Sequence, residues 1–430
     1  MAPPTMSVSP YWELTFDADG DIDPRERDRL LAGMRASGIH DVILFSHGWN
    51  NDRADATRLY SGFFAPIPAL APPAARIGYA GVVWPSMRFC DEPIPDLPHT
   101  ATATPTRGLD DGTRHALLET FPGRATVVES IARLLEQRPR EASELEEFGR
   151  LVRELVDAVP PGPQAPFAAD TLAEGVPQDG PEMLTGSTAA ACAAFATALA
   201  GLDDDGDGDL GVRGFALPHP WDGAKELLRQ ATYYAMKRRA GTVGERGLGP
   251  LVGRLAEAAP GVRVHLVGHS FGGRLVAFAL RGLPEGVRTV KSVTLLQGAF
   301  SHYAFAAQGV LQGHQNRIDG PLVCCYSRFD QALGTMYPLA SRMAGDDRGL
   351  VGEVLGAKWG AMGHDGVQSV PDTRAYRLAE VLAPGRLPAS GCVNVDAAEV
   401  VRRGGAPAGA HSDIVHPELA RVVLAAGRIT

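Results

Sequence analysis

The stretch of sequence that decides the fold is VRVHLVGHSFGG, residues 262–273. Its first six residues alternate β-branched or leucine side chains with polar ones, which is typical of a β-strand. A glycine-rich turn follows, and apolar residues then recur at helical spacing over residues 275–280. A strand that runs through a tight turn into a helix is the unit from which parallel α/β sheets are built.

The same alternation continues on both sides of this stretch. Strands are predicted over residues 8–16, 39–46, 76–84, 289–296, 321–326 and 392–395. Helices are predicted over residues 24–36, 54–64, 222–240, 271–281 and 417–426, and near 250–258. The chain is therefore expected to have an α/β fold, with a mostly parallel central sheet covered by helices on both faces.

Residues 86–220 interrupt this rhythm. They contain proline-rich and glycine-rich spacers, two predicted helices over residues 115–137 and 141–159, and an alanine-rich run over 187–200. We expect residues 1–85 and 221–430 to form the core, with a variable stretch at about 340–390. The 86–220 segment is expected to be an insertion that caps the core.

The composition of the 430 residues bears on three properties: nucleic-acid binding, disulfide formation and cellular location. The net charge is −9 and the densest basic cluster is only three residues long, so a nucleic-acid partner is not expected. The five cysteines are odd in number and scattered, which indicates reduced thiols. Neither a signal peptide nor a membrane-spanning window is evident, which predicts a cytoplasmic protein; export without a cleavable signal would leave the same pattern.

The turn GHSFG places Ser270 between Gly268 and Gly272. A serine on a strand-to-helix turn has a strained backbone, and side chains at either glycine would collide there. The helix that begins after Ser270 directs its N–H groups toward developing negative charge. An ordinary glycine turn would give the same five letters, but the flanking strand and helix favour Ser270 as a nucleophile.

A serine hydroxyl needs a base to take its proton and an acid to orient that base. The acid candidate is Asp330, which follows the strand predicted over residues 321–326 at the carboxyl end of the sheet. A helix N-cap is the structural alternative for this aspartate. Asp396 and Asp365 are the other candidates for the acid.

The candidate base is His411, which lies in a loop before the last predicted helix and follows small residues. His416 is its rival, although its place directly before Pro417 is typical of a helix entrance. His364 is expected to be a surface loop residue.

Two backbone N–H groups are needed to stabilise an oxyanion. The residue after the nucleophile, Phe271, supplies one. The sequence His47-Gly48-Trp49 follows a buried strand, and its glycine allows a turn that would bring the Trp49 N–H to Ser270. A plain glycine turn is the structural alternative.

An acidic loop resembles the start of a calcium-binding loop, with acids at positions one, three and five and glycine at six. Its twelfth position is Gly214, so the bidentate carboxylate of an EF-hand is missing. A looser calcium site and a solvated acidic loop both fit, and no other cofactor is expected. The candidate ligands are Asp203, Asp205, Asp207 and Asp209.

With these residues in place, the chain resembles the α/β-hydrolase superfamily of lipases and esterases. The resemblance covers residues 39–84, 222–332 and 391–430, and rests on the His-Gly loop, the elbow around Ser270 and the chain order Ser, Asp, His. It implies hydrolysis of a small-molecule or lipid ester through an acyl-enzyme. A phospholipase, an amidase or peptidase, an acyltransferase and a non-catalytic binding protein of the same fold remain alternatives.

Overall fold

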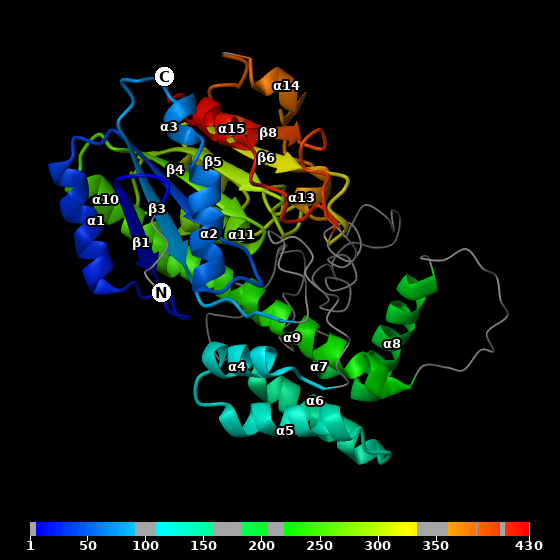
Figure 1. Cartoon of the computed structure of the whole chain (residues 1–430). Coiled ribbons are helices and arrows are strands. Elements are labelled where there is room, and N and C mark those ends of the chain that lie inside the picture. The colour runs from blue at the N-terminus through cyan, green and yellow to red at the C-terminus, as the bar shows by residue number, and fades with distance from the viewer. Residues whose placement is uncertain are drawn as a thin grey trace.

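A computed structural model describes residues 6–90, 108–157, 182–204, 219–332, 360–383, 385–404 and 409–429. Its centre is an eight-stranded sheet in the order β1-β3-β2-β4-β5-β6-β8-β7, in which all neighbouring strands are parallel (Figure 1). The α/β class expected from the sequence is therefore confirmed. The strands are β1 (Tyr11–Thr15), β2 (Asp41–Ser46), β3 (Ile77–Val83), β4 (Arg263–His269), β5 (Val290–Leu296), β6 (Pro321–Tyr326), β7 (Arg374–Arg377) and β8 (Gly391–Asp396).

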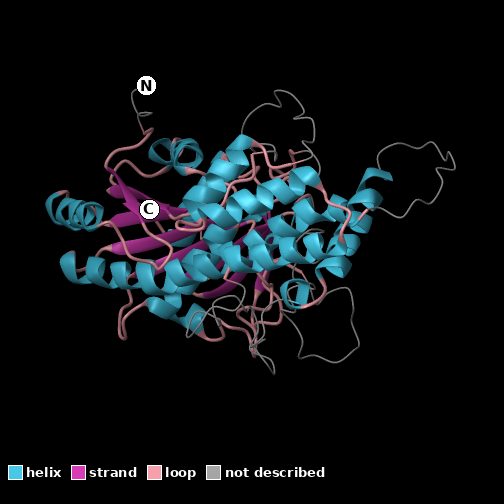
Figure 2. Ribbon diagram, turned by 90° about the horizontal axis from the view of Figure 1, so that it is seen from below, coloured by secondary structure: helices cyan, strands magenta, loops and turns pink. Residues whose placement is uncertain are grey.

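Helices cover both faces of the sheet (Figures 1 and 2). The first face is covered by α1 (Pro24–Ala36), α10 (Gly249–Ala258) and α11 (Phe271–Gly282), with α9 (Pro220–Thr242) packed on α11. The second face is covered by α2 (Arg53–Phe64), α3 (Ile67–Leu70), α14 (Leu378–Val381) and α15 (Pro417–Gly427). Two short helices, η3 (His314–Arg317) and α13 (Met362–Asp365), lie in loops.

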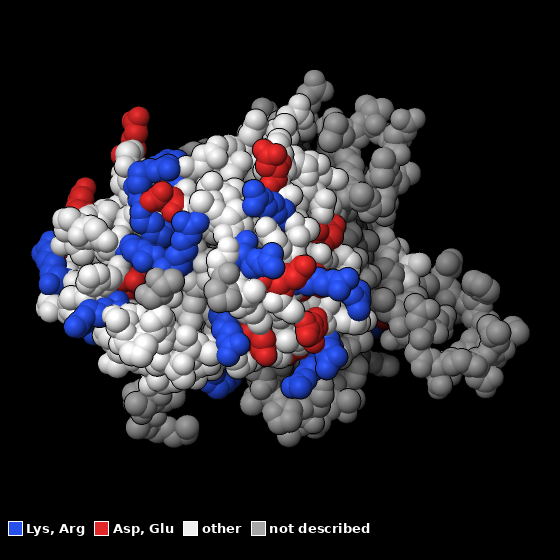
Figure 3. Space-filling view, turned by 90° about the horizontal axis from the view of Figure 1, so that it is seen from above, with Lys and Arg blue, Asp and Glu red and all other residues white. Residues whose placement is uncertain are grey.

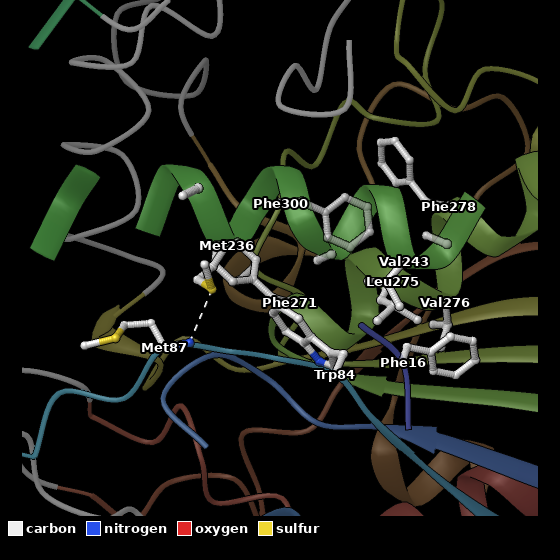
Figure 4. Close-up of a cluster of buried hydrophobic side chains, with 14 of the residues drawn as sticks. Phe16, Trp84, Met87, Met236, Val243, Phe271, Leu275, Val276, Phe278 and Phe300 are labelled. Atoms are coloured by element: carbon white, nitrogen blue, oxygen red, sulfur yellow. Dashed lines mark hydrogen bonds between the residues drawn. The ribbon is translucent and has the colours of Figure 1, made fainter. Parts of the chain in front are cut away.

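The side chains of the central strands pack into two separate hydrophobic cores, one on each face of the sheet. In β2, Val42 and Leu44 enter the core beneath α11, whereas Ile43 and Phe45 enter the core beneath α2 and α15. Successive side chains of a strand point to opposite faces, so a strand covered on both sides is apolar at nearly every position. This is why β2 reads as a continuous apolar run. Figure 4 shows part of the first core, where Phe271 and other side chains of α11 lie near Trp84.

The helices of the predicted insertion extend the first core. They gather around the N-terminal half of α9 (Figure 1), and Leu117, Ile131 and Phe148 belong to the same buried cluster as Leu227 and Met236 of α9. The helices of this predicted insertion, called the inserted helices below, are α4 (Asp111–Thr120), α5 (Ala125–Gln137), α6 (Ala142–Leu155), α7 (Glu182–Thr185) and α8 (Thr188–Asp204).

Two sequence predictions require correction, and one strand was not predicted. The helix predicted over residues 115–137 is two helices, because Pro122 and Gly123, the latter at φ +81°, end α4 before α5 begins. The helices predicted near 222–240 and 250–258 are continuous, since the π-helical turn η2 (Val243–Leu248) joins α9 to α10. Strand β7 was not predicted, because its short, mostly exposed sequence has no apolar alternation.

Charged side chains are distributed unevenly over the surface. Seen from above, Lys and Arg gather at one end of the molecule and mix with Asp and Glu elsewhere (Figure 3). None of the five cysteines forms a disulfide; Cys90 is exposed and the other four are buried. Among the described helices, none combines the length and the apolar character needed to cross a membrane.

Candidate active site

The candidate nucleophile lies where the strand order changes direction. Strands β2 and β4 are neighbours, and the chain continues from β2 toward one edge of the sheet and from β4 toward the other. In open α/β sheets, ligands bind beyond the carboxyl ends of the strands at such a switch point. Because Ser46 pairs with Gly268, the loops that begin at His47 and at Ser270 leave the sheet side by side.

Ser270 has the strained backbone expected of a strand-to-helix elbow. Its φ of 55° and ψ of −122° are unfavourable for a residue with a side chain, and α11 begins at the next residue. A Cβ atom at Gly268 would lie 2.3 Å from the Gly272 carbonyl oxygen, and one at Gly272 would lie 2.0 Å from that of Ser46. Both glycines are therefore required by close backbone packing.

A chain of hydrogen bonds joins the three residues proposed for the triad. The Ser270 Oγ lies 2.9 Å from His411 Nε2, and His411 Nδ1 lies 2.8 Å from Asp330 Oδ2. The carboxylate accepts the proton of Nδ1, which leaves Nε2 free to accept the serine hydroxyl proton. The Asp330 side chain is fully buried and the His411 side chain is 15% exposed. This geometry is that of a nucleophile, a base and an orienting acid.

Asp330 and His411 lie in short loop segments that follow the carboxyl ends of strands β6 and β8. Asp330 closes a turn just after β6, in which its N–H donates to the Ser327 carbonyl at 3.1 Å. His411 lies between β8 and α15. Two backbone hydrogen bonds fix the elbow to the end of β5 and the loop after it: the Ser270 N–H donates to the Leu296 carbonyl at 3.0 Å, and the Ser270 carbonyl accepts from the Ala299 N–H at 3.1 Å.

The alternative acids have other partners. Both oxygens of Asp365 lie 2.9 Å from Nδ1 of His302, a buried histidine that was not singled out from the sequence. Asp396 accepts from the backbone N–H of Ala398 at 2.9 Å. Neither carboxylate is hydrogen-bonded to His411.

The alternative histidines are also placed elsewhere. His416 precedes α15, as expected of a helix entrance, and its Nε2 lies 2.8 Å from Asp413 Oδ1. His364 is not a surface loop residue: it lies half-buried in α13, with Nδ1 3.3 Å from the main-chain oxygen of Asp330. Neither imidazole contacts the Ser270 hydroxyl.

The His-Gly loop is shaped by a buried imidazole. His47 Nδ1 donates to the Gly48 carbonyl at 2.8 Å, and His47 Nε2 accepts from the Trp84 N–H at 3.3 Å. Burial lowers the pKa of His47 to about 4, so it is neutral near pH 7 and can make both bonds. Because a trans peptide directs its C=O and N–H to opposite sides, the Trp49 N–H points away from His47.

The loop backbone at Gly48 lies directly against the nucleophile. A Cβ atom there would be 2.5 Å from the Ser270 Cβ and 3.1 Å from its Oγ. The Phe271 N–H belongs to the first turn of α11, where amides lack helical partners. The two backbone donors proposed for an oxyanion, at Trp49 and Phe271, thus belong to the residue after Gly48 and to the residue after Ser270. The sequence singled out the loop, but it held no signal for the structural role of the His47 ring.

A second hydrogen-bonded Asp-His-Ser set lies in the central strands β2, β4 and β5, toward their amino ends and away from the elbow. His265 Nε2 is 2.8 Å from Asp41 Oδ1, and His265 Nδ1 is 2.9 Å from Ser292 Oγ. All three side chains are buried, and Ser292 lies within strand β5 rather than on a turn. Ser292 is therefore not on an elbow beside free backbone N–H groups that could hold an oxyanion, so an Asp-His-Ser set of hydrogen bonds does not by itself define the candidate site.

The candidate calcium ligands fall outside what can be described. Asp205, Asp207 and Asp209 lie outside the described residues, and the side chain of Asp203, near the end of α8, is likewise not described. Over the described ranges, no three His, Cys, Asp or Glu side chains gather closely enough to hold a metal ion. A calcium site in this loop stays a prediction.

Two hollows in the described surface lie outside the triad. One of about 970 Å³ is bordered by β1, α1 and α2, and its Arg53 is already paired with Glu13 and Glu26. The other, about 340 Å³, is lined by Phe329 and Arg402 among others. Neither is lined by Ser270 or His411, and neither combines a nucleophile with a base.

Comparison with known proteins adds no relative. No protein-family model, no curated protein sequence and no solved structure matches this chain. A function for the chain is therefore inferred from its own residues and their geometry.

Proposed function

We propose that this chain is a serine hydrolase of the α/β-hydrolase type that cleaves a carboxylic ester. The observation that carries the proposal is the hydrogen-bonded chain from Asp330 through His411 to Ser270, with Ser270 on a strained elbow at the switch point of the sheet. An unassisted serine hydroxyl is a weak nucleophile, and this arrangement supplies the base that activates it.

The residues support a two-step reaction. His411 Nε2 takes the Ser270 proton while Oγ attacks the ester carbonyl carbon, and the N–H groups of Phe271 and Trp49 stabilise the resulting oxyanion. His411 then protonates the leaving alcohol, which departs and leaves the acyl group on Ser270. In the second step His411 deprotonates water, which attacks the acyl-enzyme and releases the carboxylic acid.

Asp330 has two tasks in this scheme. Its carboxylate holds Nδ1 of His411 protonated, so that Nε2 presents a lone pair to Ser270, and it stabilises the imidazolium that forms when the serine proton is taken. Complete burial excludes water from this carboxylate. Because charges interact more strongly where the effective dielectric constant is low, burial strengthens its effect on the imidazolium.

The inserted helices are proposed to cap the site and to select the ester. Tyr233 of α9 packs with its ring centre 4.6 Å from that of Phe271 and 5.2 Å from that of Trp49. Helix α9 is also the element on which the inserted helices pack. The insertion is thereby connected, through α9, to both residues whose N–H groups are proposed to hold the oxyanion.

Labelling with a fluorophosphonate probe tests the proposal. The purified wild-type chain should be labelled at Ser270, as identified by mass spectrometry, whereas Ser270→Ala should not react. Ser292→Ala is the matched control, because Ser292 is also bonded to a histidine that contacts an aspartate. Its folded fraction should be labelled. An unlabelled wild type would favour a non-catalytic protein of this fold, and equal labelling of Ser270→Ala would place the reactive group elsewhere; either result overturns the proposal.

A substrate series then defines the kind of hydrolase. Hydrolysis of p-nitrophenyl esters from acetate to palmitate separates a short-chain esterase from a lipase. A matched p-nitroanilide tests for amidase activity, and an added alcohol acceptor tests for acyl transfer. The ester proposal requires ester cleavage well above amide cleavage; the reverse order would contradict it.

A further inference from the structure

His269, which lies between Gly268 and Ser270 in the sequence, contacts the backbone of the proposed base, His411. Its Nε2 lies 2.9 Å from the main-chain carbonyl oxygen of His411, and the two rings are 5.1 Å apart at an angle of 43°. A carbonyl oxygen can only accept a hydrogen bond, so Nε2 of His269 carries the proton. The residue before the nucleophile is thereby bonded to the backbone of the base.

Burial keeps this histidine neutral. Its side chain is 3% exposed, and burial, together with the nearby His411, lowers its pKa to about 3. A neutral donor has a further advantage. His411 must become an imidazolium during the reaction, and a second cation about 5 Å away in a buried site would oppose that change.

The other ring nitrogen shows what orients the imidazole. Nδ1 of His269 is buried and has no hydrogen-bond partner among the residues that the structure describes, and it faces the Gly48 backbone, where a Cβ atom would lie 3.2 Å away. A buried polar atom without a partner is costly and needs an explanation. The bond from Nε2 to His411 supplies one, because the ring cannot turn Nδ1 toward a partner without losing that bond.

We propose that His269 is a positioning residue for the base: its Nε2–H anchors the His411 backbone to the elbow and so fixes the distance between the imidazole and the Ser270 hydroxyl. The inference rests on the proposed function of Ser270 and His411. His411 lies in a segment between β8 and α15 rather than in a regular element. This contact thus joins the segment that carries the proposed base to the residue adjacent to Ser270, although the two are remote in sequence.

Two substitutions separate a donor from a space-filling side chain. His269→Gln keeps an N–H donor of similar reach, whereas His269→Leu keeps an apolar side chain and removes the donor. We expect His269→Leu to lower kcat and the labelling rate by about 10- to 100-fold, since displacements near 1 Å can cost about 10²-fold. KM should change little, and His269→Gln should recover most of the loss.

The pattern across the two variants decides the outcome. A folded His269→Leu variant that reacts at the wild-type rate would overturn the proposal. A His269→Gln variant that is folded but as slow as His269→Leu would overturn it too. Circular dichroism and thermal unfolding establish that each variant is folded. A change confined to thermal stability, with kcat unaltered, would indicate a packing role only.

A spectroscopic measurement tests the contact without relying on activity. In protein labelled with ¹⁵N-histidine, His269 should appear as the neutral tautomer protonated at Nε2, and should not titrate between pH 5 and pH 8. A titrating His269, or one protonated at Nδ1, would overturn the inference. If the wild type were not labelled by the probe, the proposed function would fail, while this spectrum would still test the His269–His411 contact.

Discussion

Asp330 and Gly409 form an isolated antiparallel bridge, which ties the turn that carries the proposed acid to the segment that carries the proposed base. The neighbouring residues add a bond, in which the Ala410 N–H donates to the Phe329 carbonyl at 2.9 Å. Gly409 adopts φ +59°, and a Cβ atom on it would lie 2.5 Å from the Phe329 carbonyl oxygen. The separation of Asp330 and His411 is thus set by backbone pairing as well as by their side chains.

Gly409→Ala should therefore separate the base from the acid. A shift near 1 Å at this bridge is expected to slow labelling of Ser270 by about 10²-fold. Gly38→Ala is the matched control, because Gly38 also adopts φ +59° but an added Cβ would have no atom of the described residues within 4 Å. It carries the backbone strain alone and should be labelled at the wild-type rate. Equal rates in the two variants would contradict a role for the bridge.

Gly48→Ala should block the site while leaving the sheet intact. The added methyl would collide with the Ser270 side chain, so the His-Gly loop and its Trp49 N–H must move away from the nucleophile. Loss of one oxyanion donor costs about 10²- to 10³-fold in kcat. Gly108→Ala is the comparison, since over the described part of the chain its Cβ would make only ordinary contacts, the closest at 3.7 Å from Glu136 Cβ. Ester hydrolysis is the measurement, and a fully active Gly48→Ala enzyme would exclude this loop from the site.

Replacing each candidate acid in turn identifies the one that acts. Asp330→Asn should lower kcat by about 10⁴-fold, because an amide favours the wrong tautomer of His411. Asp365→Asn and Asp396→Asn should have little effect, as those carboxylates contact His302 and the Ala398 N–H instead. The three folded variants are compared in one ester assay. A larger loss in either of the latter two would show that Asp330 is not the acid.

Stability should fall as the pH is lowered from about 6.5. Burial lowers the pKa of His47 to about 4 and that of His269 to about 3, whereas an unfolded histidine titrates near 6.5. Below about pH 6.5 the unfolded chain binds protons that the folded chain does not, so the free energy of unfolding decreases with acidification by about 1.4 kcal/mol per pH unit for each such histidine. Above about pH 6.5 this contribution to stability is fully present.

Urea unfolding at several pH values checks this linkage. In His269→Gln the slope between about pH 6 and pH 4 should be smaller than in the wild type by the share of one histidine, about 1.4 kcal/mol per pH unit. Identical slopes would mean that His269 is protonated in the folded chain. The measurement does not depend on any catalytic activity.

The parts of the fold that follow from local patterns were predictable. Helix α1 begins at Pro24, as predicted, because the Asp23 side chain caps its first turn. Strand β2 is a short apolar run and β4 alternates apolar with polar residues before a glycine-rich turn, so the existence of both could be predicted together with the elbow at Ser270. Strand β7, by contrast, is short, mostly exposed and polar, and is stabilised by pairing with β8 rather than by its own sequence.

The partners of Ser270 were harder to predict than Ser270 itself. Asp330 and His411 are 81 positions apart, and their contact depends on where two loops meet, which no local pattern records. Three alternatives, Asp365 and Asp396 for the acid and His416 for the base, were therefore compatible with the sequence. Asp365 illustrates the difficulty: it is hydrogen-bonded to His302, a residue that no motif marked. Buried imidazoles that act on the backbone, as His47 and His269 do, leave no recognisable signal in a single sequence.

The unbroken helix that runs from α9 through η2 into α10 has a consequence for cooperativity. Its N-terminal half is covered by the inserted helices, and its C-terminal half packs against α11, the helix that begins next to Ser270. Removing the inserted helices would expose the apolar side chains of α9, including Trp221, Leu227 and Leu228. The two parts of the chain are thus expected to melt together, as one thermodynamic unit.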